Sequence, residues 1–211
     1  MSQFGGRLAN AIARLTAKSL FRIDAQNLDK IPLEGPYILV SNHISALELP
    51  PLRVLMHPRH VRTLAKVETW ENKILGWVLD QWDTIPIKRG ESDMAALRTS
   101  LQVLKDGGIL GIMPEGTRSG DGQLGRGNPG VTILALKSGC PIVPMAFWGV
   151  ENAKTNIKKL RRTDFHFRAG DPFMLEPPTG KPTHENRQQM ADIVMQHIAD
   201  LLPEDYRGVY R

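Results

Sequence analysis

The sequence predicts an α/β fold: a single domain with a mixed, mostly parallel sheet flanked by helices. Short runs rich in β-branched and other apolar residues alternate along the chain with longer segments that carry helix start and stop signals. Most of the short runs are apolar on both faces, as expected of strands that are covered on both sides. The 211 residues, 41% of them hydrophobic and 23% charged, are enough to build one full core.

The N-terminal residues 4–23 are predicted to form an amphipathic helix, with no acidic residue before Asp24. Its apolar residues share one face and its cations lie beside them: Leu8, Ile12 and Leu15, and Arg7, Arg14 and Lys18. Two interpretations stay open, a helix at the surface of an anionic membrane and a helix packed on its own domain with its cations in water. We therefore separate an N-terminal helical segment, residues 1–30, from a main domain, residues 31–211.

Strands and helices are predicted to alternate after this segment. The predicted strands cover residues 37–41 (YILVS), 60–66, 84–88 (TIPIK), 109–113 (ILGIM), 142–147 (IVPMAF) and 164–168 (DFHFR). Helix signals lie between and after them: a Ser92 cap for a helix that ends at Gly107, Pro129 and Gly139 at the two ends of another, and Thr183 at the start of a last helix that reaches about Leu202.

The charge balance is basic, with 27 Lys and Arg against 22 Asp and Glu, a net charge of +5. Such a surface suits nucleic acid, anionic lipid or phosphorylated substrates, and composition does not choose among them. Cys140 is the only cysteine, so no disulfide forms within the chain and a reducing compartment is expected. No apolar run approaches the roughly 20 residues that span a bilayer, and no secretory signal is recognisable, so we expect a protein that touches a membrane without crossing it.

A histidine follows the first predicted strand. Residues 37–41 lead directly into Asn42 and His43, and Ser45 and Glu48 come next. Open α/β sheets bind ligands beyond the carboxyl ends of strands, where a neutral imidazole can take a proton from a hydroxyl. Glu48 can fix the tautomer of His43 only if His43 lies in the loop and Glu48 in the following turn. Ser45 and Glu48 also fit a capping box, so a purely structural role for Glu48 stays open.

Two further strand ends carry groups that suit an anion. After the strand ILGIM comes Met113-Pro-Glu-Gly-Thr-Arg-Ser119, whose arginine, hydroxyls and backbone amides are typical phosphate donors. The strand TIPIK closes on Lys88 and Arg89, followed by Gly90. In each case a solvated surface charge is the alternative interpretation.

Together these segments resemble the glycerolipid acyltransferase family, whose best-known members acylate lysophosphatidic acid. The family's first motif is N-H-x-S-x-x-D, which Asn42, His43 and Ser45 match, while Glu48 stands where Asp is usual. The second, an apolar strand closing on a basic residue, is similar to residues 85–89.

The third family motif, F-P-E-G-T-R-S, resembles residues 113–119 with only the first residue changed, and the fourth, an apolar strand with a proline, is similar to residues 141–144. Order and spacing agree as well, over about residues 30–170. The resemblance implies that residues 31–211 form an acyltransferase domain.

The resemblance implies a mechanism and a set of site residues. His43 would deprotonate an acceptor hydroxyl, which attacks the acyl thioester of acyl-CoA or acyl carrier protein, with Glu48 supporting the histidine. The substrate-binding residues would be those of the matched motifs: Asn42, Ser45, Lys88, Arg89, Glu115, Gly116, Thr117, Arg118 and Ser119. Among them Arg89 and Arg118, with Lys88, would hold the acceptor phosphate. No metal, cofactor or covalent acyl-enzyme is implied.

The function expected from this resemblance is O-acyl transfer to a lysophospholipid-type acceptor, 1-acylglycerol 3-phosphate, in phospholipid synthesis at the cytoplasmic face of a membrane. Other acceptors, glycerol 3-phosphate or a phosphatidylinositol glycoside, are alternatives. A non-catalytic lipid-binding relative is a third, because Glu48 replaces the usual Asp. Acyl-chain length and the choice between CoA and carrier protein stay open.

Three other sequence features do not indicate a separate binding function. Gly125–Gly130 fits G-x-G-x-x-G but does not directly follow a strand, so dinucleotide binding is not expected. The basic stretch 154–168 lacks a nucleic-acid recognition motif, so no nucleic-acid partner is expected. Trp70, Trp77 and Trp82 are interpreted as core residues, with an acyl groove or membrane patch as the alternative.

Overall fold

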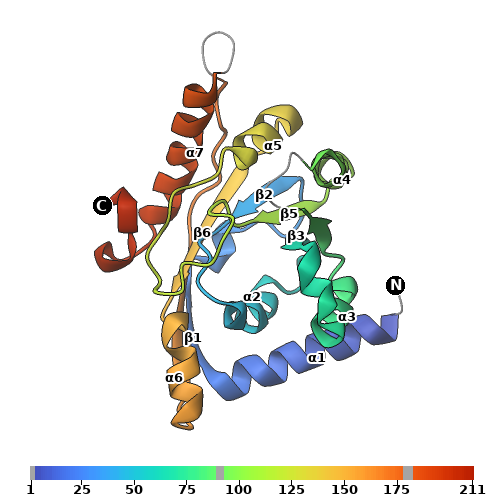
Figure 1. Cartoon of the computed structure of the whole chain (residues 1–211), viewed down its shortest axis with the longest axis vertical. Helices are drawn as coiled ribbons and strands as arrows, with labels where there is room; N and C mark the ends of the chain where they lie inside the picture. The colour runs from blue at the N-terminus through green and yellow to red at the C-terminus, as the bar shows by residue number, and fades with distance from the viewer. Residues whose placement is uncertain (1–2, 89–92, 178–182) are drawn as a thin grey trace.

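The structure, a computed structural model, describes residues 3–88, 93–177 and 183–211 (Figure 1). The strands are β1 (Phe21–Gln26), β2 (Tyr37–Val40), β3 (Val61–Lys66), β4 (Ile85–Ile87), β5 (Ile109–Ile112), β6 (Ile142–Trp148) and β7 (Thr163–Ala169). The helices are α1 (Gln3–Leu20), α2 (Leu49–Met56), α3 (Lys73–Gln81), α4 (Met94–Lys105), α5 (Gly130–Ser138), α6 (Ala153–Lys158) and α7 (His184–Ala199). Short 3₁₀ helices lie in several of the connections.

One sheet holds the seven strands, in the order β1-β7-β6-β2-β5-β3-β4. The strands β6, β2, β5, β3 and β4 run parallel to one another, while β1 and β7 are parallel to each other and β7 is antiparallel to β6. The prediction of a mixed, mostly parallel sheet is confirmed. Because β2, β5 and β6 are parallel neighbours, their carboxyl ends meet at one edge of the sheet.

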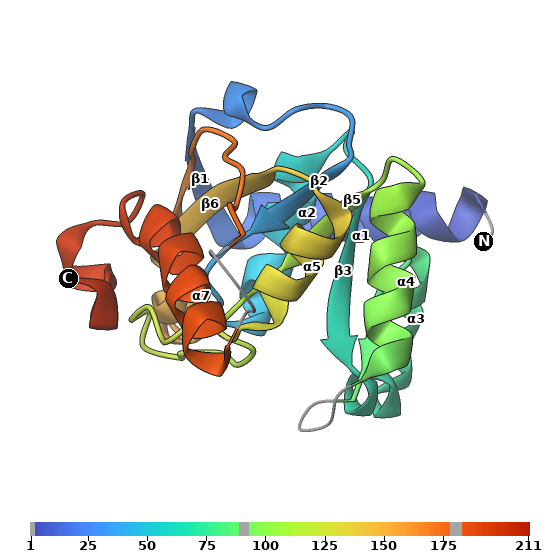
Figure 2. The same ribbon diagram turned by 90° about the horizontal axis from the view of Figure 1, so that it is seen from above.

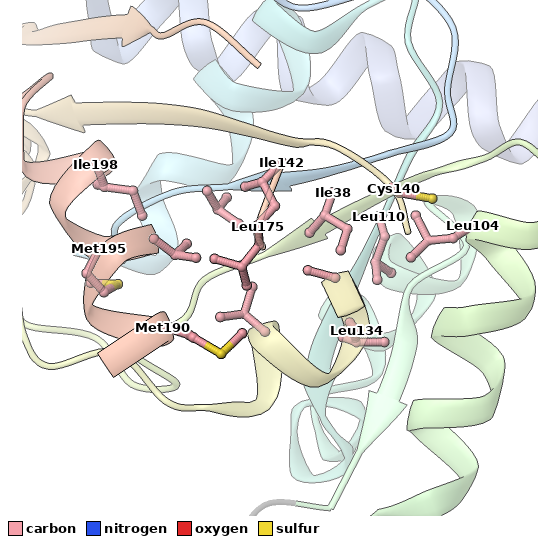
Figure 3. Close-up of a cluster of buried hydrophobic side chains, with 14 of the residues drawn as sticks. Ile38, Leu104, Leu110, Leu134, Cys140, Ile142, Leu175, Met190, Met195 and Ile198 are labelled. Carbon is pink, nitrogen blue, oxygen red and sulfur yellow. The ribbon is translucent and has the colours of Figure 1, made fainter. Parts of the chain in front are cut away.

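Helices cover both faces of the sheet, and alternate residues of each buried strand point into different cores. In β2, Ile38 and Val40 join a cluster with α4, α5 and α7, whereas Tyr37 and Leu39 face a cluster that includes α2. Figure 3 shows the first cluster, in which side chains from α4, α5, α7 and the central strands lie together. In Figures 1 and 2, α5 and α7 lie on one side of the sheet and α1 and α2 on the other.

The N-terminal helix is shorter than predicted. We expected helix over residues 4–23, but α1 ends at Leu20 and Phe21 begins β1, which pairs in parallel with β7. Phe21 is buried, and its ring and the Phe165 ring pack in a T-shaped arrangement with their centroids 5.9 Å apart. This partner lies more than 140 residues away, so the helical pattern of the preceding residues concealed the strand.

The other strands lie where they were predicted, with ends that move by one residue at most. At α5 the expected stop is confirmed, since Gly139 has φ 63, the left-handed conformation that glycine adopts without strain. Thr183 caps α7 by accepting a hydrogen bond from the Asn186 N–H at 3.1 Å. For α4 the predicted cap, Ser92, lies outside the described residues, and Asp93 caps the helix by accepting from the Ala95 and Ala96 N–H groups at 3.1 and 2.9 Å.

The tryptophans divide between core and surface. Trp82 is buried against Ala9 and Ala13 of α1, which confirms the core interpretation for this residue. On α3, by contrast, Ile74 and Trp77 are exposed.

Candidate active site

The three loops that follow β2, β5 and β6 build one site at the carboxyl edge of the sheet. Asn42 joins the first and third of these strands. Its buried side chain donates to the Phe147 carbonyl at 2.8 Å and accepts from the Phe147 N–H at 3.0 Å. Both ends of the amide are thus used by the backbone of β6, so Asn42 supports the site by fixing where the chain leaves β2.

His43 and Glu48 are in direct contact. The Nδ1 atom of His43 lies 2.5 Å from Glu48 Oε1, and the two side chains are 13% and 0% exposed. His43 sits in the loop after β2, and Glu48 ends the 3₁₀ helix Ala46–Glu48, which is the arrangement that the spacing required. With the carboxylate on Nδ1, the neutral imidazole carries its proton there and keeps a lone pair on Nε2.

The two roles considered for Glu48 coexist. Its second oxygen, Oε2, accepts hydrogen bonds from the Ile44 and Ser45 N–H groups at 3.0 and 2.7 Å. Ser45 Oγ in turn accepts from the Leu47 N–H at 3.3 Å, and the capping box is present. One carboxylate oxygen therefore caps the turn while the other binds His43, and the cap fixes the position of the catalytic candidate.

The loop after β5 is tied to the loop after β2 through Glu115 and two backbone bonds. Glu115 accepts from the His43 N–H at 2.7 Å and from the Gly125 N–H at 2.9 Å. Burial raises the pKa of Glu115, and these two backbone bonds act in the opposite direction. The Ser119 and Gly120 N–H groups donate to the carbonyls of His43 and Ile44 at 2.9 and 3.2 Å. Glu115 thus fixes the loop that carries His43 against the loop after β5.

The turn between them allows this close approach. Gly116 has φ 67, a left-handed conformation that glycine adopts freely but that is strained for residues with a side chain. Thr117 and Arg118 follow it and are exposed. Ser119 accepts a hydrogen bond from the Gly122 N–H at 3.2 Å, so its hydroxyl shapes the loop.

A cleft of about 600 Å³ opens beside this junction. Its lining comes from all three loops: Ile44, Ser45, Ala46, Leu47, Arg118, Gly120, Glu151 and Lys154. Among the residues that the structure describes, neither Arg118 nor Lys154 has a side-chain hydrogen bond or ion pair to another residue. Two unpaired cations therefore line the cleft, which suits an anionic ligand.

Glu151 and Lys154 were not among the predicted site residues. They follow β6 in the 3₁₀ helix Val150–Asn152 and in α6. The Tyr206 hydroxyl donates to Glu151 Oε1 at 2.8 Å. Burial is the main cause that raises the pKa of Tyr206 to about 12, and the hydrogen bond to this carboxylate is the second. Glu151 follows the predicted strand 142–147 closely, the kind of position that pointed to His43, whereas Lys154 lies further along, in a stretch of several cations.

Lys88, the described basic residue after β4, is not brought to this cleft. Lys88 is exposed, its backbone N–H donates to Asp93 Oδ2 at 2.9 Å, and it is absent from the cleft lining. Its strand is the last in the sheet, separated from β2 by β5 and β3. Arg89 lies outside the described residues. Within the described part of the chain, no group of three His, Cys, Asp or Glu side chains is placed to hold a metal ion.

Comparison with known proteins agrees with this geometry. The family model Acyltransferase matches residues 22–148, more than half of the chain. The chain belongs to this family. The match confirms the resemblance inferred from the motifs at His43, Ile85 and Met113, all of which lie inside it.

Several relatives of this acyltransferase share a name. The 1-acyl-sn-glycerol-3-phosphate acyltransferase of Bacillus subtilis is 28% identical over 180 residues, 85% of this chain and 87% of the relative. The chloroplastic BAT2 enzyme of that name from Brassica napus is 30% identical over 145 residues, 67% of this chain and 42% of the relative. The chain thus spans less than half of the plant relative.

A solved structure shares the fold. The 1-acyl-sn-glycerophosphate (LPA) acyltransferase PlsC from Thermotoga maritima matches with a TM-score of 0.66 and 23% identity, over 93% of this chain and 79% of that one. At this identity the likeness concerns the fold, and it confirms the α/β architecture.

Proposed function

We propose that this acyltransferase moves a fatty acyl group from acyl-CoA or acyl carrier protein to the free hydroxyl of 1-acylglycerol 3-phosphate. The observation that carries the proposal is the 2.5 Å contact between His43 Nδ1 and a fully buried Glu48, set beside a cleft with two unpaired cations. The names of the relatives support the same acceptor.

In this mechanism His43 Nε2 takes the proton of the acceptor hydroxyl as the oxygen attacks the thioester carbonyl. The new C–O bond gives a tetrahedral intermediate, which collapses with cleavage of the C–S bond. The imidazolium returns its proton to the departing thiolate, so the products are a diacyl lipid and a free thiol. Glu48 stabilises the imidazolium between these steps and keeps the ring oriented.

Arg118 and Lys154 bind the acceptor phosphate in this proposal. Their charges line the cleft beside the loop that carries His43, and a charged hydrogen bond to phosphate is worth about 1.5–3 kcal/mol. Proton transfer falls to His43 and anion binding to these cations, so the proposed reaction calls for no metal or organic cofactor.

Thiol release tests the proposal directly. Purified protein is incubated with palmitoyl-CoA or palmitoyl carrier protein, with and without each acceptor: 1-acylglycerol 3-phosphate, glycerol 3-phosphate and a phosphatidylinositol glycoside. We expect release that depends on 1-acylglycerol 3-phosphate, and a loss of about 10²- to 10⁴-fold in folded His43→Ala. Release that depends on another acceptor would identify that acceptor as the substrate. The absence of release with all of them would favour a non-catalytic lipid-binding protein.

We also propose that α1 binds the surface of an anionic membrane, on its cytoplasmic face. The helix packs on the domain through its small residues, since Ala9, Ala13 and Ala17 are buried. Its larger apolar residues point outward instead, with Phe4 76% and Leu15 68% exposed. The two interpretations of this helix are therefore compatible, because one face packs and the other is free.

The charges beside the outer face support this membrane proposal, since Arg7, Arg14 and Lys18 are all exposed and α1 contains no acidic residue. In the described residues no helix has the length and apolar content needed to cross a bilayer. The free, buried Cys140 is compatible with the reducing side of a membrane.

A further inference from the structure

The turn that ends α6 holds a leucine where glycine is usual. The Leu160 N–H donates to the Ile157 carbonyl at 3.0 Å and the Arg161 N–H to the Asn156 carbonyl at 2.9 Å, the bond pattern of a Schellman motif. Leu160 takes the left-handed position of this motif, with φ 52. A side chain in that conformation costs energy that glycine would not incur, so the leucine weakens the turn that it completes.

The Leu160 side chain gains nothing in return from the rest of the protein, because it is 96% exposed. The residues around it are strongly basic and include no acid between 153 and 162: Lys154, Lys158, Lys159, Arg161 and Arg162. An apolar tip surrounded by cations matches the boundary between acyl chains and anionic head groups. Conformational cost and full exposure together indicate a partner outside the chain.

This turn is joined to the end of α1. The Arg162 guanidinium donates to the Phe21 carbonyl, with Nε at 3.0 Å, and Phe21 pairs with Thr163 at the start of β1 and β7. The next acidic residue in the sequence, Asp164, is held by Arg22, with Nε and Oδ1 2.5 Å apart. In Figure 1, α1 and α6 lie along the same lower edge of the molecule. The end of α1 and the turn after α6 are therefore neighbours.

The same helix also reaches the cleft. Lys154 lines the cleft, and Leu160 lies six positions further along the chain, just past the end of α6. We propose that Leu160 and its surrounding cations form a second membrane anchor, which with the outer face of α1 seats the cleft against an anionic leaflet. The inference rests on the proposed lipid acceptor for its purpose, but membrane binding itself requires no turnover.

Binding to vesicles of phosphatidylcholine with about one third phosphatidylglycerol tests the anchor. We expect Leu160→Asn and Leu160→Gly to lower the partition coefficient by about tenfold, from the loss of most of a leucine's burial. Leu160→Gly should also unfold at the parent temperature or above it, because glycine fits φ 52 without strain. Val209→Asn, which replaces another exposed apolar side chain (70%) near the C-terminus, is the matched control and should bind within twofold of the parent.

Measurements of acyl transfer distinguish contact of Leu160 with a bilayer from contact with a protein partner. If Leu160 meets the membrane, Leu160→Asn lowers transfer more for an acceptor presented in vesicles than for a short-chain, water-soluble acceptor. Parent-like vesicle binding by both Leu160 variants would overturn the anchor. A loss confined to carrier-protein donors, with unchanged vesicle binding, would overturn it in favour of a protein contact. If the parent transfers no acyl group but the variants lose vesicle binding, the anchor stands and the proposed function fails.

Discussion

Replacing Glu48 by glutamine should lower kcat by about 10³- to 10⁴-fold while the fold survives. Glutamine has the shape of glutamate but one oxygen becomes an NH₂ group. Two fixed donors, the Ile44 and Ser45 N–H groups, face Glu48 Oε2 at 3.0 and 2.7 Å. The amide oxygen must therefore take that position, and the NH₂ group must point at His43 Nδ1.

This orientation decides the size of the effect. An NH₂ group facing Nδ1 can only donate, so the neutral imidazole carries its proton on Nε2 and loses the lone pair that the acceptor hydroxyl needs. The imidazolium also loses its carboxylate. Both backbone bonds persist, so we expect a loss of stability of about 1 kcal/mol, or roughly 2–4 °C in Tm. Glu48→Asp keeps the charge but falls short by about 1 Å, a displacement that costs about a hundredfold in rate.

The assay is thiol release from palmitoyl-CoA at saturating 1-acylglycerol 3-phosphate, with Tm measured on the same samples. Glu71→Gln, the same chemical change at an exposed site, is the control and should match the parent. Glu48→Gln with kcat within tenfold of the parent would show that the carboxylate only caps its turn. A collapse of Tm in Glu48→Gln would instead show that the bonds to Ile44 and Ser45 are not kept, and Glu48→Asp would then carry the test.

Three further outcomes are expected. Arg118→Ala and Lys154→Ala should each raise the acceptor KM by about 10- to 100-fold with a smaller change in kcat, whereas Lys105→Ala should not; unchanged KM in both would remove the phosphate site. The double variant Leu8→Asn, Leu15→Asn should bind anionic vesicles at least tenfold more weakly, an effect that parent-like binding would refute. Dialysis against EDTA should leave thiol release unchanged, and restoration by added Mg²⁺ or Zn²⁺ would contradict a metal-free reaction.

The central sheet was predictable because the local sequence pattern of its strands indicates β-structure. The six predicted runs are short and most of them are apolar, and each became a strand within one residue of its expected ends. The strand β1 has no such signature. Its sequence FRIDAQ has one buried residue, Phe21, and continues a helical pattern, so only its pairing with β7 makes it a strand. Pairing partners this distant in sequence leave no local trace.

The candidate site was predictable in its motifs and only partly in its geometry. The strand-end rule located His43 and the loop of Arg118. It could not tell that Glu48 would serve the turn and the histidine together, because that depends on two oxygens pointing in different directions from one carboxylate. Lys154 was hidden for another reason: it stands in a basic stretch where most cations are simply solvated, and only the folded position of α6 separates it from its neighbours.

The position of α6 relates the two halves of the proposed function. Its first turn carries Lys154 into the cleft, and the turn that follows its last residue exposes Leu160 to the surroundings. A lysophospholipid has the same polarity along its length, with a phosphate that must reach cations and an acyl chain that prefers the bilayer. If Leu160 enters the leaflet, Lys154 lies at the other end of α6, a helical rise of about 6 Å from Lys158 and comparable to the thickness of the head-group layer. The acceptor then need only bring its head group toward His43, and its acyl chain stays in lipid throughout the reaction.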